Sequence, residues 1–321
     1  MPARIAKLKS LAKINLDLRI LNKREDGFHE LRTVFQTISL ADTIQIECKI
    51  ARRTHLEIEG NVDIPNNLIL QAAQAVLDEA RIHAHVKFRL KKRIPMGGGL
   101  GGGSSNAAAV LIALPVLLGR EVKVENIAAK LGSDVSFFLH GGTAIALGRG
   151  AEIYGLPEIA EQEILVVASG IHVATGPAYA ALHRGLTFTE SSNKINGFQE
   201  FVRALGELRR ADLASALGEN DFEAVVFRQF PKLKQILVKL SQFGAARMSG
   251  SGSTIYAILP SKGSQKRAKK VLERDRVFQG CELVSACLVS RKSYQRMWRR
   301  QLREHIVPGD DLWPPRSRYA R

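Results

Sequence analysis

Residues 97–103 read GGGLGGG, so six of these seven positions are glycine. Glycine loses more backbone entropy on folding than any other residue, so a folded chain keeps such a run only where it needs unusual dihedral angles or close approach to the main chain. The run leads directly into SSNAAAVLIALPVLL, which predicts a helix from about Ser104 to Leu118. The N–H groups of such a loop and of the helix that follows can bind phosphate. The sequence therefore predicts a phosphate-binding loop.

The flanking residues argue against three other kinds of glycine-rich segment. A Walker A loop has Lys-Ser or Lys-Thr directly after its glycines, and here Ser-Ser follows. Residues 97–102 match the dinucleotide-binding pattern G-x-G-x-x-G in form only. The strand expected before them alternates and is followed by Pro95, whereas a Rossmann first strand is usually a continuous apolar run. A flexible linker does not usually lead straight into a strong helix.

Periodicity along the chain predicts an α+β fold. Residues 11–20 alternate with period two, which predicts a strand with Lys13 and Asn15 on its polar face, pointing to the same cleft. The segments that follow show no strict strand–helix alternation, as a parallel α/β sheet would. Further strands are expected at 43–50, 54–59, 86–94, within 140–150, at 163–169, on both sides of a turn within 243–259, and at 282–289; the clearest helices are expected at 67–80, 104–118 and 124–130.

The length of 321 residues fits two domains. We expect an N-terminal domain over residues 1–158 and a C-terminal domain over 159–290, because a new buried strand begins near residue 160. Residues 291–321 contain Pro-Pro, many arginines and little core pattern. They are expected to form an appended basic tail that is partly helical.

The formal net charge of +16 raises the possibility of a nucleic-acid partner. The distribution of the charge makes such a partner unlikely on sequence grounds. Residues 291–321 contain nine Lys/Arg against three Asp/Glu, and KRAKK at 266–270 resembles the solvated face of a helix. A phosphorylated small-molecule substrate would also suit a basic cleft.

The sequence shows no sign of a membrane or of an oxidising compartment. No apolar run is long enough to span a bilayer, and the N-terminus lacks the uninterrupted apolar core of a secretory signal. Cys48, Cys281 and Cys287 follow no metal or disulfide pattern, which suggests reduced thiols in the cytoplasm. A monomer and a weak dimer are both compatible with the sequence.

Four segments of the chain resemble the GHMP kinases, the family of galactokinase, homoserine kinase, mevalonate kinase and phosphomevalonate kinase. PMGGGLGGGSSNAA resembles their ATP-binding motif. The other three segments, in the family's order, are AKINLDLRILNKREDGFHEL (12–31), LGSDVSFFLHGGTA (131–144) and RMSGSGSTIYAI (247–258). All four resemble the branch that acts on cytidine diphosphate methylerythritol in the non-mevalonate (MEP) pathway to isoprenoid precursors. Ser136 stands where the family usually has proline and Phe28 where it often has tyrosine; we expect neither to abolish activity.

The resemblance implies the two-domain GHMP kinase fold. The N-terminal domain would be like ribosomal protein S5, the C-terminal domain would be a ferredoxin-like α/β domain, and ATP and the substrate would bind in the cleft between them. The implied reaction is ATP-dependent phosphorylation of the substrate's 2-hydroxyl, with ADP as the other product. Mg²⁺ is expected with ATP.

The resemblance also implies catalytic and ATP-binding residues. Asp134, otherwise a loop or N-cap aspartate, matches the family's proposed base. Lys13, otherwise a solvated strand lysine, would pair with Asp134 and stabilise charge on the reacting groups. A capping or solvated role explains Asn67 and Lys92 nearly as well as a place near the adenine. The implied ATP-binding residues are Pro95, Met96, Gly97, Gly98, Gly99, Leu100, Gly101, Gly102, Gly103, Ser104, Ser105, Asn67 and Lys92.

For the substrate, the resemblance implies that His29 reads the cytosine edge and that Tyr179 stacks on the base. Thr175 would contact a phosphate, and residues 249–253 would lie near the diphosphate. Phe28 would pack near the base or in the core. The full set of implied substrate-binding residues is Asn15, Phe28, His29, Thr175 and Tyr179.

Two other functions compete with this one. Another GHMP kinase, acting on homoserine or mevalonate, would have no use for the cytosine-reading segment DGFHEL. A non-catalytic nucleotide-binding or RNA-binding protein is suggested by the net charge, but the presence of both Lys13 and Asp134 argues against it. The basic tail could bind an acidic partner, which deletion of residues 291–321 would test.

Overall fold

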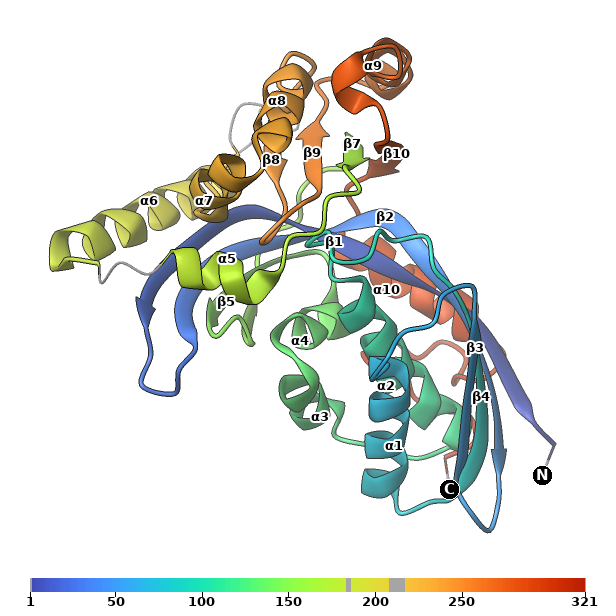
Figure 1. The fold of residues 1–321 in the computed structure, drawn as a ribbon. Helices are drawn as coiled ribbons and strands as arrows, with labels where there is room; N and C mark the ends of the chain where they lie inside the picture. Colours follow the sequence, from blue (N-terminus) through green and yellow to red (C-terminus); the bar gives the residue numbers. More distant parts are fainter. Residues whose placement is uncertain (1, 183–185, 208–216, 321) are drawn as a thin grey trace.

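A long hairpin forms the centre of the first of two sheets in the computed structural model, which describes residues 2–182, 186–207 and 217–320 (Figure 1). Its strands are β1 (Arg4–Lys23) and β2 (His29–Ile50). The second half of β2 also pairs with β4 (Ala84–Lys91), and its first half pairs with β5 (Thr143–Gly148). The sheet is completed by β3 (His55–Gly60), which is parallel to β4, and by β6 (Glu152–Gly155), which is antiparallel to β5.

The predicted strand at 43–50 is therefore only the second half of β2. The first half, which the sequence analysis did not identify as a strand, is hydrogen-bonded on both sides, to β1 and to β5. Residues 33–38 are all buried, so both faces of this stretch are covered. Alternation is the signal of a strand with one solvated face, and this stretch has none.

Helices α1, α2, α3 and α4 form a layer beside this sheet (Figure 1). The glycine run leads into α2, whose residues from Ser105 to Leu118 are all buried. A helix that is apolar on every side must lie inside a domain, and α2 is the centre of the N-terminal core. Around it lie α1, α3 and α4. The bounds of the four helices are α1 (Leu68–Ala80), α2 (Gly102–Leu118), α3 (Val124–Leu131) and α4 (Ser133–His140).

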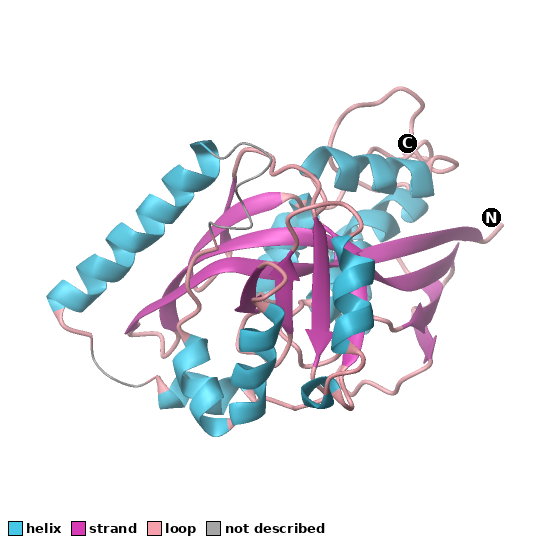
Figure 2. Cartoon of the chain, turned by 90° about the horizontal axis from the view of Figure 1, so that it is seen from above, coloured by secondary structure: helices cyan, strands magenta, loops and turns pink. Residues whose placement is uncertain are grey.

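The second sheet is antiparallel, in the order β10–β7–β9–β8. Helices α8 and α9 cover it and α7 packs beside α8, while the long helix α6 lies along one side of the molecule (Figures 1 and 2). The strands are β7 (Glu163–Ala168), β8 (Ala245–Met248), β9 (Ile255–Ile258) and β10 (Glu282–Cys287). The helices are α5 (Thr175–Ala181), α6 (Phe188–Glu207), α7 (Phe222–Gln229), α8 (Pro231–Leu240) and α9 (Ser264–Leu272), with a short 3₁₀ turn at Arg276–Phe278. None of the described helices is long and apolar enough to cross a bilayer.

The two sheets meet through the middle of β1. Ala12, Ile14 and Leu16 pack against apolar residues of β7 and β9, among them Ile164 and Tyr256, in one continuous buried cluster. The opposite, polar face of β1 is also buried, because it faces the site described below. One strand therefore contributes to both the interdomain core and the site.

Residues 291–321 have a core pattern that the sequence analysis overlooked. They begin with α10 (Arg291–Leu302), where Tyr294, Trp298 and Leu302 recur every four residues and lie in the N-terminal core. The many arginines of α10 hid this stripe, which is typical of an amphipathic helix. Lys292, Arg296 and Arg300 are exposed, so much of the basic charge is the polar face of this helix.

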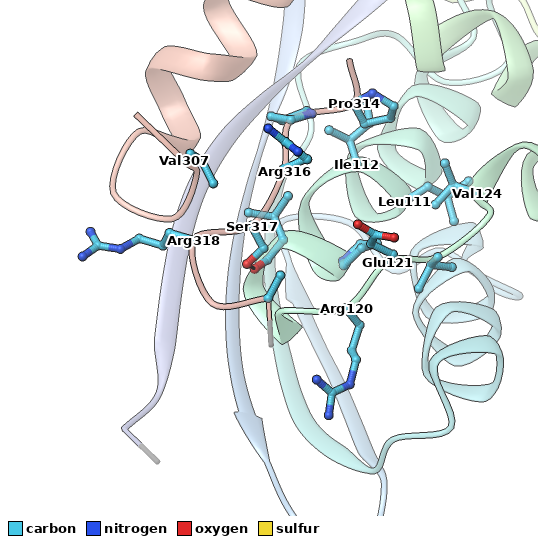
Figure 3. Close-up of a pocket in the computed structure, with 15 residues that line it drawn as sticks. Leu111, Ile112, Arg120, Glu121, Val124, Val307, Pro314, Arg316, Ser317 and Arg318 are labelled. Atoms are coloured by element: carbon cyan, nitrogen blue, oxygen red, sulfur yellow. Dashed lines mark hydrogen bonds between the residues drawn. The ribbon is translucent and has the colours of Figure 1, made fainter. Parts of the chain in front are cut away.

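The chain after α10 turns back over α2. The hydroxyl of Ser317 donates a hydrogen bond to the carbonyl of Val116 at 2.6 Å, and the Arg4 guanidinium lies 3.7 Å from the centre of the Tyr319 ring. Between this segment and α2 lies a cavity of about 530 Å³, with Leu111 and Ile112 on one side and Pro314 on the other (Figure 3). The first and last described residues thus belong to the same domain, and the two ends of the chain lie close together (Figure 1).

The buried stripe of α10 makes a prediction about stability. Trp298→Ala removes a fully buried indole, so the free energy of unfolding should fall by about 3–5 kcal/mol in a urea titration followed by circular dichroism. Arg300→Ala, on the exposed face of the same helix, should change it by less than about 0.5 kcal/mol. Equal effects of the two substitutions would show that α10 is not docked.

Candidate active site

A cavity of about 360 Å³ lies where the two domains meet. Each of the four segments singled out in the sequence contributes to its lining, and so does α5. Of the predicted residues, the cavity brings together nine: Lys13, Asn15, Gly97, Gly99, Gly101, Ser104, Asp134, Thr175 and Tyr179. The larger cavity beside the tail is lined by none of the predicted residues.

Lys13 and Asp134 face each other in this cavity. The Lys13 Nζ lies 3.5 Å from Asp134 Oδ2 and donates a hydrogen bond to Asn15 Oδ1 at 2.7 Å. It also lies 4.8 Å from the centre of the Phe35 ring. The lysine side chain is 4% exposed and the aspartate side chain 30%. Burial lowers the pKa of Lys13, and the charge of Asp134 partly offsets this effect. A carboxylate open to the cavity is thus held beside a buried amine.

Register shifts in β1 and the turn before α4 orient the side chains of Lys13 and Asp134. Lys13 and Asn15 lie between two register shifts of β1, at Leu11/Ala12 and at Asn15/Asp17, and such bulges redirect side chains. Asp134 lies in the first turn of α4, where the helix dipole favours a negative charge. Gly132 both ends α3 and begins α4, with dihedral angles (φ 157°, ψ 152°) that favour glycine.

Asn15 connects the two domains at this point. Its side-chain Nδ2 donates to Thr33 Oγ1 at 2.7 Å, and its main-chain carbonyl accepts a hydrogen bond from the Tyr256 hydroxyl at 2.7 Å. The polar face of β1 is therefore buried and hydrogen-bonded, so Lys13 is not the solvated strand lysine that the sequence alone would suggest.

The glycine run packs against a second glycine turn, at residues 249–254 of the other domain. A Cβ on Gly99 would lie 2.0 Å from the carbonyl oxygen of Ser249, and one on Gly98 would lie 2.3 Å from Thr254 Oγ1. Gly97, Gly99 and Gly101 have positive φ angles of 66°, 76° and 69°. By contrast, a Cβ on Gly103 would come no closer than 3.8 Å to another residue. Close packing between the domains therefore explains part of the glycine run.

The two serines after the run play different parts. Ser104 lines the cavity, but the Ser105 hydroxyl donates to the carbonyl of Leu11 at 2.6 Å and is buried. Neither serine is the N-cap of α2, as the sequence suggested, because Gly101 occupies that position. The helix begins two residues earlier than predicted.

Asn67 and Lys92 do not line the cavity. The Asn67 side chain caps α1 by accepting a hydrogen bond from the N–H of Ile69 at 3.0 Å, which is the capping role considered above. The Lys92 side chain is 6% exposed and pairs with Asp42 at 2.5 Å. Asp42 also accepts hydrogen bonds from the N–H groups of residues 93 and 94, so it anchors the chain as it enters the glycine run. No pattern in the sequence pointed to Asp42.

Aromatic side chains meet at one side of the cavity. The rings of His29 and Tyr179 are stacked, with centroids 4.9 Å apart and 21° between the planes, although His29 itself is not among the lining residues. Burial and the nearby charge of Asp134 raise the pKa of Tyr179 to about 12. Phe28 is 56% exposed, and the guanidinium of Arg149 lies 4.9 Å from its ring centre. Arg149 lines the cavity and was missed in the sequence, where it reads as an ordinary turn residue.

Within the 249–253 segment, Gly250 and Ser251 line the cavity. Ser249 Oγ donates to the carbonyl of Gly99 at 2.9 Å and so joins the two glycine turns. Asn220, another residue the sequence analysis missed, donates through Nδ2 to the carbonyls of Met248 and Gly250 at 2.7 and 2.8 Å. Ser251 Oγ and Thr175 Oγ1 are 3.0 Å apart.

Comparison with known proteins bears on both domains. Residues 67–142 match the family model of the GHMP kinases N terminal domain, and residues 199–276 match that of the GHMP kinases C terminal domain. The chain is 49% identical over 325 residues to the 4-diphosphocytidyl-2-C-methyl-D-erythritol kinase of Solibacter usitatus (strain Ellin6076), covering 98% of each chain. That similarity extends through most of residues 291–321. Identity to the enzyme of the same name from Pseudothermotoga lettingae is 35%, over 83% of this chain and 96% of the relative.

Solved structures show the same fold. A crystal structure of 4-(cytidine 5'-diphospho)-2C-methyl-D-erythritol kinase superposes with a TM-score of 0.71 at 31% identity, covering 88% of this chain and 98% of the other. Homoserine kinase from Cytophaga hutchinsonii superposes with a TM-score of 0.68 at 16% identity, covering 89% and 95%. The two-domain α+β GHMP kinase fold expected from the sequence is confirmed.

The two classes of glycine in the run can be separated by mutation. Gly99→Ala places a methyl group against the Ser249 carbonyl at a positive φ angle, so it should lower the melting temperature and weaken ATP binding measured by calorimetry. Gly103→Ala, inside α2 with open space around it, should leave the melting temperature unchanged or raise it. If Gly99→Ala were as stable as Gly103→Ala, the packing explanation would be wrong.

Proposed function

Because the chain belongs to the GHMP kinases, and within them to the 4-diphosphocytidyl-2-C-methyl-D-erythritol kinases, we propose that its interdomain cavity transfers the γ-phosphoryl group of ATP to the 2-hydroxyl of 4-diphosphocytidyl-2-C-methyl-D-erythritol. The products are ADP and the 2-phosphate of the substrate, in the MEP pathway to isoprenoid precursors. The observation that carries this proposal is the pairing of Lys13 with Asp134 in a cavity that is also lined by the glycine run. The three cysteines of the chain are free thiols, which is consistent with a cytoplasmic enzyme.

In this mechanism Asp134 accepts the proton of the substrate's 2-hydroxyl while the oxygen of that hydroxyl attacks the γ-phosphorus. The bond between that phosphorus and the β–γ bridging oxygen breaks, and the electron pair stays on ADP. Lys13 lies beside the carboxylate and stabilises negative charge on the attacking oxygen or on the transferred group. Its burial strengthens this electrostatic effect, because few water molecules can screen the charge.

ATP binds with its phosphates along residues 97–104. The positive end of the α2 dipole and the N–H groups of its first turn face this position, and the Ser104 hydroxyl lines it. Mg²⁺ bound to the phosphates would neutralise part of their charge. The described residues hold no cluster of three or more metal-binding side chains, but Mg²⁺ in kinases is commonly held by one or two carboxylates together with the phosphates. Asp134 is the single carboxylate among the described lining residues, and it would hold the ion together with a hydroxyl of the glycine run such as that of Ser104.

The cytosine binds at the aromatic side of the cavity. A base between two rings needs roughly 7 Å, about twice the 3.4 Å separation of stacked bases, and His29 and Tyr179 are only 4.9 Å apart. His29 must therefore move off Tyr179 when the base arrives, which leaves the tyrosine ring for stacking and the imidazole for hydrogen bonds to the base edge. Arg149 also lines the cavity, and Phe28 lies beside its guanidinium.

A different alcohol substrate and an RNA partner are the alternatives. Identities of about 16% to homoserine kinase and 15% to mevalonate kinase establish a common fold and give no reason to prefer their substrates. The net charge that suggested RNA is in part the polar face of α10, as described above.

The reaction and its base can be tested together by measuring ADP release. With ATP, Mg²⁺ and 4-diphosphocytidyl-2-C-methyl-D-erythritol we expect turnover, and with homoserine or mevalonate none. Asp134→Asn should lower kcat by about 10²–10⁴-fold while ATP still binds, because proton transfer is lost and the loop is intact. Turnover with another alcohol would refute the substrate assignment, and an active Asp134→Asn would refute the assignment of the base.

The stacking role of Tyr179 makes a separate prediction. Tyr179→Ala should raise KM for the cytidine substrate by about 10–100-fold, since stacking on a base is worth about 1–3 kcal/mol, and should leave KM for ATP unchanged. Tyr179→Phe is the matched control, because it keeps the ring and should behave like the parent. A Tyr179→Phe variant as weak as Tyr179→Ala would assign binding to the hydroxyl instead.

A further inference from the structure

The C-terminal segment, residues 291–320, binds the last turn of α4, the helix that carries Asp134. The last four carbonyl groups of a helix have no partner within it, so α4, which ends at His140, needs partners from elsewhere. The hydroxyl of Tyr294 donates to the carbonyl of Phe138 at 2.6 Å, and Trp313 Nε1 donates to the carbonyl of Leu139 at 2.7 Å. Side chains more than 150 positions away along the chain thus bind the last turn of α4.

Both sides of this contact are shaped to fit. A Cβ on Gly141 would lie 2.5 Å from Cδ1 of the Tyr294 ring, and one on Gly142 would lie 2.6 Å from the Cβ of Arg291. The two glycines have φ angles of 66° and 75°, so α4 ends in a turn that leaves room for α10. Tyr294 is 1% exposed.

Phe138 connects the contact with Tyr294 to the surroundings of Lys13. Phe138, whose carbonyl Tyr294 binds, lies one helical turn after Asp134 and therefore on the same side of α4. A Cβ on Gly101 would be 2.8 Å from the Phe138 ring and 3.2 Å from Cγ of Lys13. One residue of α4 therefore contacts the C-terminal segment through its carbonyl and contacts the glycine run, beside the stem of Lys13, through its ring.

We propose that Tyr294 and Trp313 are positioning residues of the phosphoryl-transfer site. By holding the last turn of α4, they fix the separation of Asp134 from Lys13 and seat Phe138 against the glycine run. The proposal rests on the proposed roles of Asp134 and Lys13. The C-terminal segment is then part of the catalytic framework, although none of its described residues lines the cavity.

The test compares Tyr294→Phe and Trp313→Phe with Tyr319→Phe in the full-length enzyme. Tyr319 lies in the same segment, and its hydroxyl is 3.1 Å from Nδ1 of His305, away from α4, so its loss is a matched control. A misplacement of reacting groups acts on the chemical step, so kcat should fall about tenfold in the first two variants while KM for either substrate changes less than about threefold. Tyr319→Phe should keep the parental kcat.

Docking of the segment can be followed independently. Both tryptophans of the chain, Trp298 and Trp313, lie in it, so their fluorescence reports whether it stays in place in Tyr294→Phe and Tyr319→Phe. An unchanged emission spectrum with a lowered kcat supports positioning. A lowered melting temperature with a parental kcat in both Tyr294→Phe and Trp313→Phe would mean that the contact is structural only, and would overturn the proposal.

The same measurements separate this proposal from the proposed function. If Asp134→Asn is inactive and Tyr294→Phe is as fast as the parent, only the positioning role fails. If Asp134→Asn is as active as the parent, the assignment of the base fails, and the positioning role that rests on it fails too.

Discussion

The close approach of two glycine turns, one from each domain, is the constraint on which the site depends. Residues 97–101 and 249–254 pack main chain against main chain, and a methyl group on Gly99 would overlap the carbonyl of Ser249. The hydrogen bond from the Ser249 hydroxyl to the Gly99 carbonyl joins the two turns. Since each turn is attached to its own sheet, this contact, together with the apolar cluster around β1, holds the domains so that Lys13 and Tyr179 line the same cavity.

The second requirement concerns the middle of β1, residues 10–21, where both faces of the strand are buried. Its apolar side chains form the interdomain cluster, and its polar side chains Lys13 and Asn15 lie in the site. Burying an ammonium group is costly, and here the nearby carboxylate of Asp134 and the amide oxygen of Asn15 compensate for part of the lost hydration. The packing between the domains and the proposed chemistry thus use opposite faces of one strand.

Local patterns were sufficient to predict much of this molecule. The alternation at 11–20, the helix capped by Asn67, and the apolar helix after the glycine run all have signals within a few residues. What escaped prediction depends on partners distant in the chain. The first half of β2 is covered on both faces, Asp42 and Asn220 act by holding loops, and the steric need for Gly98 and Gly99 arises about 150 residues away. The stripe of α10 was present in the sequence but was obscured by its arginines.

The N-terminal domain is built from both ends of the chain, with β1 at one end and α10 and the residues after it at the other. Proteins generally fold domain by domain as they are synthesised, starting from the N-terminus. Here the order is different, because the first domain to leave the ribosome lacks Tyr294 and Trp298 until the strands of the C-terminal domain have been made. The C-terminal domain, whose strands end at Cys287, is complete earlier. The helix that carries Asp134 therefore receives the contacts of Tyr294 and Trp313 only after the C-terminal domain has been made, so a chain that stops short of α10 is released without a finished core.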